Sequence, residues 1–163
     1  MTPTRETLLA LADRVEALTA PDREVDAEIM CAVFGYERDG TMFYGKSRDY
    51  VLERDYYALE GSPQELPSPT ASLDAAMTLV PEGRGWLAGY GRIRPDEPLG
   101  GAMITRIAAP TSFAPDAADK IAEAEAATPA LALTAASLRA RATLTDHPVT
   151  SDPPPALDGG SDG

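Results

Sequence analysis

Residues 72–94 have the sequence SLDAAMTLVPEGRGWLAGYGRIR, in which a helix, a tight turn and a strand follow directly on one another. Ser72 can accept a hydrogen bond from a first-turn N–H, and apolar residues then recur at helical spacing. Pro81, Gly83 and Gly85 end the helix and reverse the chain. From Trp86 onward the side chains alternate, as they do on the two faces of a strand. The stretch predicts an α/β fold.

The residues after this strand predict an antiparallel partner strand and a final helix. Residues 102–108 alternate as a strand, and the short segment 95–101 before them is expected to be a loop, which favours antiparallel pairing. Residues 110–127 are rich in alanine and acids and predict a loop with a helical patch. Thr128 and Pro129 then mark the start of the last helix, with Leu131, Ala135, Leu138 and Ala142 on one face.

Two helices are expected before this unit. Thr4 can cap the first, whose leucines and valine form one stripe, and Gly35 is well placed to end the second. We expect Pro21 in the first turn of the second helix, where proline is tolerated. Residues 42–44 predict a short strand, while residues 50–58 leave a strand and a helical turn as alternatives.

The chain as a whole is predicted to form one α/β domain: a small, mostly antiparallel sheet flanked by helices in a sandwich-like α-β-α arrangement. We divide it into a helical pair at 1–35 and a sandwich domain at 36–144, with enlarged loops at 40–69 and 95–127. Residues 145–163 are acidic and lack apolar content, so a disordered tail is expected there.

Composition narrows the classes of function. The chain has 163 residues, 44% of them hydrophobic, and no apolar run approaches the length of a membrane span. Its formal net charge of −12 argues against extended nucleic acid as a partner, because phosphate backbones are bound by clustered Lys and Arg. A single cysteine excludes an intramolecular disulfide. We therefore expect a cytoplasmic protein that does not bind membranes.

Two segments resemble the phage ABA sandwich domain family. Residues 72–83, SLDAAMTLVPEG, precede a strand that starts with Trp86, and residues 126–142, AATPALALTAASLRARA, form a terminal helix opened by Thr-Pro. The resemblance implies helices on both faces of a small sheet, and a phage or prophage accessory protein in a bacterial cell. The family has no assigned general activity, so it supplies no catalytic residues.

The residues themselves do not form a catalytic or metal-binding constellation. His147, the only histidine, lies in the predicted tail, and Cys31 lies in a short apolar helix, where a buried inert thiol is expected. One Cys and one His cannot make a common zinc site. Solvated loop charges are the expected role of Glu53, Asp55, Asp96 and Glu97. We expect no cofactor and no metal, and leave enzymatic activity open.

A set of aromatic and cationic residues is the candidate ligand site: Tyr44, Lys46, Arg48, Trp86, Tyr90, Arg92, Arg94 and Arg106. Without a bulge, the members in residues 86–94 face one side of the sheet. Aromatic rings can stack on a base, and Arg can pair with phosphate. The alternative is that Trp86 and Tyr90 are core residues and the arginines are a solvated strand end.

Two glycines beside Tyr90 have a separate interpretation. Gly89 and Gly91 do not form a dinucleotide fingerprint, because the strand does not lead into a helix and a third glycine is missing at the required spacing. They can accommodate a bulge or close sheet packing, or they can let a ligand approach the backbone.

Three functions follow as hypotheses. The first is a non-catalytic accessory protein that sequesters a small anionic nucleotide-type immune signal, an anti-defence sponge. The second is an acidic protein-interaction module, or a nucleic-acid mimic, that blocks a host protein. The third is a metal-dependent hydrolase that uses carboxylates. Self-association into a homo-oligomer is also expected, since small accessory proteins often have sheets too small to cover themselves.

Overall fold

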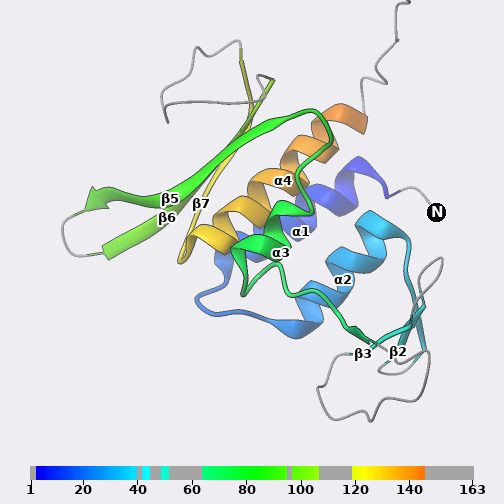
Figure 1. Cartoon of the computed structure of the whole chain (residues 1–163). Helices are drawn as coiled ribbons and strands as arrows, with labels where there is room; N and C mark the ends of the chain where they lie inside the picture. Colours follow the sequence, from blue (N-terminus) through cyan, green and yellow to red (C-terminus); the bar gives the residue numbers. More distant parts are fainter. Residues whose placement is uncertain are drawn as a thin grey trace, which may run out of the picture.

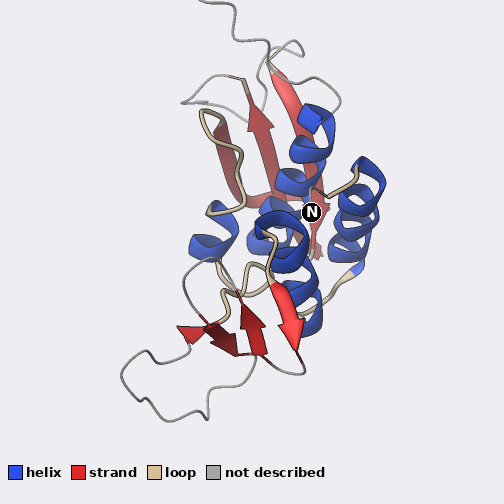
Figure 2. Ribbon diagram, turned by 90° about the vertical axis from the view of Figure 1, so that its right-hand side faces the viewer, coloured by secondary structure: helices blue, strands red, loops and turns tan. Residues whose placement is uncertain are grey.

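The computed structural model describes residues 3–39, 42–44, 49–51, 64–94, 97–106 and 119–145. The described part contains helices α1 (Arg5–Ala17), α2 (Arg23–Phe34), α3 (Leu73–Met77) and α4 (Pro129–Thr145). The α/β class predicted from the sequence is confirmed. Figure 2 shows a layer of helices between two sheets, and the larger strands lie at the top of that view.

The three-stranded sheet has the order β5-β6-β7 and is antiparallel throughout. Its strands are β5 (Gly85–Arg94), β6 (Glu97–Thr105) and β7 (Lys120–Ala126). α4 packs across all three strands, and α1 packs on α4 and on β7 (Figure 1). The first helix therefore belongs to the same core as the sheet, and it has more contact with α4 than with α2.

The second sheet is smaller and lies beyond α2, away from the first sheet (Figure 1). Its order is β1-β2-β3-β4, with β1 (Glu37–Asp39), β2 (Met42–Tyr44), β3 (Asp49–Val51) and β4 (Gln64–Glu65). The first two pairings are antiparallel and the last is parallel. The predicted strand at 42–44 is confirmed, and the start of the ambiguous segment 50–58 belongs to β3.

α4 is the central element of the core. Every residue from Ala130 to Leu138 is buried, including Thr134 and Ser137, so the helix is enclosed on all sides. The predicted stripe of Leu131, Ala135, Leu138 and Ala142 is buried, but it is only part of the buried surface. A helix that is apolar around its circumference is expected to be enclosed in this way. Its many alanines also let neighbouring elements approach closely.

The local signals for helix ends are confirmed at four positions. Thr4, Ser72 and Thr128 each accept a hydrogen bond from a backbone N–H three residues on, with donor–acceptor distances of 3.1, 3.4 and 3.3 Å. Gly35 ends α2 with φ 70°, a left-handed conformation that favours glycine. The prediction that Pro21 lies in the first turn of the second helix is wrong, because α2 begins two residues later, at Arg23. Its cap is Asp22, whose Oδ1 accepts from Glu24 N at 2.9 Å.

Two predicted loops are wrong. Residues 97–101 belong to β6, which begins at Glu97 rather than at residue 102 and ends at Thr105. Residues 120–126 form β7, whereas we predicted a loop with a helical patch. The sequence of β7, KIAEAEA, consists mostly of residues with helical preference. Its alternation decides the structure: Ala124 and Ala126 are buried, while Glu123 and Glu125 are exposed.

Several predictions lie outside the described residues. These are the structure of residues 146–163, including His147, and the site residues Lys46 and Arg48. No described helix is long and apolar enough to cross a membrane.

Candidate binding site on the outer face of the sheet

The β5-β6-β7 sheet has two unlike faces. On the face that we call the helix face, Trp86, Ile104 and Ala122 are register partners, as are Ala88, Ala102 and Ala124. All six pack in or against the core that α1 and α4 form. The opposite face, which we call the outer face, carries the alternate residues Leu87, Gly89, Leu99, Gly101, Met103, Glu123 and Glu125.

The helix face is closed by direct backbone contact at Gly100. A Cβ atom on this glycine would lie 2.1 Å from the carbonyl carbon of Thr128 and 2.3 Å from the nitrogen of Pro129. The start of α4 therefore rests on β6 at a point where no side chain fits. Glycine is needed here because a side chain has no room, and not because the backbone has a left-handed φ.

The outer face is open at the neighbouring position. Gly89, Gly101 and Glu125 lie side by side across the three strands, and a Cβ on Gly101 would meet no atom within 4 Å. A hollow of about 710 Å³ lies over these glycines. Its described lining also includes Leu99, Met103, Glu123 and Glu125 of the outer face, Tyr90, Ala102 and Ala124 of the helix face, and Glu16 and Arg139 of α1 and α4. This volume is within the range of ligand-binding pockets.

The hollow has an acidic lining. Glu16, Glu123 and Glu125 contribute carboxylates, whereas Arg139 is the one cationic side chain among its described lining residues. Glu123 forms an ion pair of 2.7 Å with Lys120, and its side chain keeps 65% exposure. Glu125 is also exposed. A ligand in the hollow therefore meets a surface of net negative charge.

Arg139 is already engaged by the protein. Its guanidinium donates to both carboxylate oxygens of Glu16 at 2.6 Å, and to Asp13 Oδ1 at 3.0 Å and the backbone oxygen of Glu123 at 3.2 Å. Partial burial lowers the pKa of Arg139, but the hydrogen bonds and charges of Glu16 and Asp13 outweigh it and raise that pKa above its ordinary value. The arginine thus ties α4 to α1 and to the edge of β7, with its charge matched internally.

The structure does not gather the predicted aromatic and cationic set at one place. Trp86 is partly buried on the helix face and packs against the core. Tyr90 is 67% exposed and lines the hollow, and Arg106 is exposed beyond the opposite end of β6. Tyr44 lies in the other sheet. Six residues separate Gly100, the partner of Tyr90, from Arg106, which is about 20 Å along a strand.

Arg92 and Arg94 lie in β5, but the argument that placed them beside Tyr90 fails. The pairing of β5 with β6 shifts register between Gly91 and Arg94. A bulge of this kind ends the strict alternation of side chains, so parity no longer assigns Arg94 to the face of Trp86 and Tyr90.

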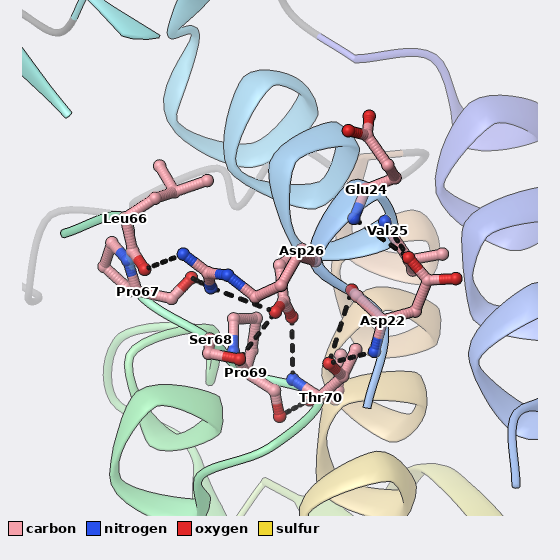
Figure 3. Close-up of polar contacts among 11 residues, drawn as sticks. Asp22, Glu24, Val25, Asp26, Leu66, Pro67, Ser68, Pro69 and Thr70 are labelled. Atoms are coloured by element: carbon pink, nitrogen blue, oxygen red, sulfur yellow. Dashed lines mark hydrogen bonds and ion pairs between the residues drawn. The ribbon is translucent and has the colours of Figure 1, made fainter. Parts of the chain in front are cut away.

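A buried polar cluster at the start of α2 was not predicted from the sequence. Asp26 is fully buried, and its carboxylate accepts from Ser68 Oγ at 2.6 Å, from Thr70 N at 2.9 Å and from Arg23 at 3.2 Å (Figure 3). The same arginine donates to Leu66 O at 2.8 Å.

The cluster has a structural role. It fastens the proline-rich segment 66–70 to α2, and Thr134 Oγ1 of α4 donates to Pro69 O at 2.9 Å from the other side. Each carboxylate oxygen of Asp26 has partners within the chain, so the group is satisfied rather than directed at a ligand. In the sequence, the Ser-Pro-Thr run at 68–70 lies more than 40 residues from the acidic start of α2, so no local pattern marks their pairing.

No metal or nucleophile site emerges within the described ranges. They hold no group of three or more His, Cys, Asp or Glu residues placed to bind a metal ion. Cys31 is partly buried and packs against Ala27, Met30 and Leu66.

The chain has no match among protein-family models, curated proteins or solved structures.

Proposed function

We propose that the protein is a non-catalytic binding protein whose outer-face hollow takes a short basic segment of a partner protein. The observation that carries this proposal is the acidic lining around a floor of glycines. Gly89 and Gly101 raise no side chain from the floor, so a peptide backbone can approach the sheet closely. Leu99, which is partly exposed, supplies apolar contact for the stem of a Lys or Arg side chain.

Charge favours a basic ligand over a free anion. Glu125 carries an exposed carboxylate at the hollow, Glu123 is exposed although it pairs with Lys120, and Arg139 is engaged by Glu16 and Asp13. The net charge of −12 adds a long-range field that attracts a basic partner. The attraction by the local carboxylates and the attraction by the net charge both weaken as salt is added, because exposed charges are screened.

The setting that we propose is the one implied by the resemblance: a phage or prophage accessory protein in the bacterial cytoplasm that occupies a basic surface of a host protein.

Sequestration of a small nucleotide is the second candidate. Tyr90 favours it, because an exposed ring at the hollow is a stacking surface for a base. Tyr90→Ala is then expected to weaken nucleotide retention and leave the fold intact, because the ring is 67% exposed. Unchanged retention would remove Tyr90 from the site.

The test of the first candidate is calorimetric titration with an Arg- and Lys-rich peptide that carries one aliphatic residue, and with a matched acidic peptide. We expect binding of the basic peptide only, with a Kd that rises between low and physiological salt. Glu125→Gln should weaken binding several-fold. Glu82→Gln removes the same charge from an exposed position outside the described lining and should leave the affinity nearly unchanged.

Equal effects of the two substitutions would show that net charge acts alone, without the hollow. Binding of a nucleotide and not of the basic peptide would favour the second candidate.

A further inference from the structure

We propose that two copies of the chain pair through the outer edges of their β5 strands, which joins their three-stranded sheets into one continuous antiparallel sheet. This interaction surface differs from the one proposed above, because strand pairing uses the backbone edge of β5, although Gly89 and Tyr90 of that strand also line the hollow.

The two edges of the sheet are treated differently by the rest of the molecule. At the β7 edge, Arg139 donates to the backbone oxygen of Glu123, and α1 and α4 both contact the strand. β7 also carries Lys120, Glu123 and Glu125, charges of the kind that discourage pairing at an edge. These features protect the β7 edge from pairing with another strand.

The β5 edge is less protected in the part of the chain that the structure describes, where α4 contacts β5 less than it contacts β7. β5 is the end strand of the sheet and spans 10 residues. Its first seven residues, from Gly85 to Gly91, include no charged residue and no proline. A long uncharged edge of this kind offers unpaired N–H and C=O groups to another strand. An identical strand is self-complementary under two-fold symmetry.

The exposed ring of Tyr90 favours a second copy of β5 as the partner strand, and it indicates the register in which the two strands pair. Its ring is 67% exposed, although it lies on the edge strand and shares the helix face with Trp86. Antiparallel pairing of two β5 strands centred on Ala88 places each Tyr90 opposite Trp86 of the partner subunit. Directly opposed aromatic residues stabilise antiparallel pairs, and this register forms two such pairs. It also keeps the helices of both copies on the same side of the joined sheet.

The experiment is sedimentation equilibrium of the full chain over a range of concentrations, with Tyr90→Lys as the test variant. We expect a dimer for the unchanged protein at about 100 µM, and a dimer Kd raised at least about tenfold by Tyr90→Lys, because both aromatic pairs are lost at once. Met77→Lys is the matched control. Met77 is 41% exposed on α3, away from the edge, and its replacement should leave the Kd unchanged.

A second measurement identifies the edge directly. Hydrogen exchange of alternate β5 amides should slow as the concentration rises into the dimer range, and it should not depend on concentration in Tyr90→Lys. A monomer at about 100 µM would overturn the proposal. So would a dimer that persists in Tyr90→Lys, a dimer lost equally in Met77→Lys, or β5 exchange that is independent of concentration.

Discussion

Gly100 and Gly101 are neighbours in β6, yet they lie on opposite faces of the sheet, and only one of the two positions has room for a side chain. Gly100 meets the backbone at the start of α4, where an added Cβ would lie 2.1 Å from an atom. Gly101 looks onto the hollow, where an added Cβ would meet nothing within 4 Å. One glycine permits the core to close, and the other leaves a surface open.

The comparison extends to the whole sheet. The helix face contributes small apolar residues to a core in which α4 is enclosed, and this face carries the stability of the fold. On the outer face Met103 is buried as well, but the sheet around Gly89 and Gly101 presents an acidic hollow. Under the function proposed above, one face of the sheet carries the stability of the fold and the other binds the partner, so substitutions on the two faces should affect stability and affinity separately.

The largest expected effect is on the helix face. Ile104 is fully buried, so Ile104→Ala should lower the free energy of unfolding by about 2–5 kcal/mol, through lost burial and a new cavity. Leu87, one strand away on the outer face, is partly exposed, and Leu87→Ala should cost about half as much or less. Urea denaturation of both variants tests this difference, and equal losses would contradict the division between the faces.

The glycine pair gives the next effect. Gly100→Ala should lower the free energy of unfolding by about 3 kcal/mol, at the upper end of overpacking costs, because the obstacle is backbone rather than a side chain that can rotate. Gly101→Ala should change it by less than about 1 kcal/mol. Thermal or urea unfolding measures both, and a tolerated Gly100→Ala would mean that α4 does not rest on β6 as described.

The smallest effect concerns a polar atom within the central helix. Among the described residues, Ser137 Oγ is a buried side-chain atom without a hydrogen-bond partner. Ser137→Ala removes an unsatisfied hydroxyl, so the free energy of unfolding should stay the same or rise by up to about 1 kcal/mol. A loss of more than about 1 kcal/mol in urea denaturation would show that the hydroxyl has a partner.

The sequence predicted the parts of the fold that depend on neighbouring residues. Caps at Thr4, Ser72 and Thr128 and the left-handed Gly35 follow from local hydrogen bonding and backbone freedom, and the structure confirms them. The turn into β5 was predicted for the same reason.

The parts that depend on distant residues were not predicted. β7 has helix-favouring residues and becomes a strand because alternate alanines fit against α4. Asp26 is separated from Thr70 by 44 residues, and Arg139 from Glu16 by 123, so no local pattern pairs them. The outer-face hollow depends on the register of three strands. Ligand approach is one interpretation of Gly89 and Gly91 from the sequence, but the alignment of Gly89 with Gly101 and Glu125 follows only from strand pairing.

The measurement that tests the central claim most directly compares stability and peptide affinity in Gly101→Leu. The new side chain would enter the hollow without meeting the core, since the position has free space and an ordinary backbone conformation. We expect a free energy of unfolding within about 1 kcal/mol of the unchanged protein, and a Kd for the basic peptide raised at least about tenfold. A variant that remains folded and binds the peptide as tightly as before would contradict the account.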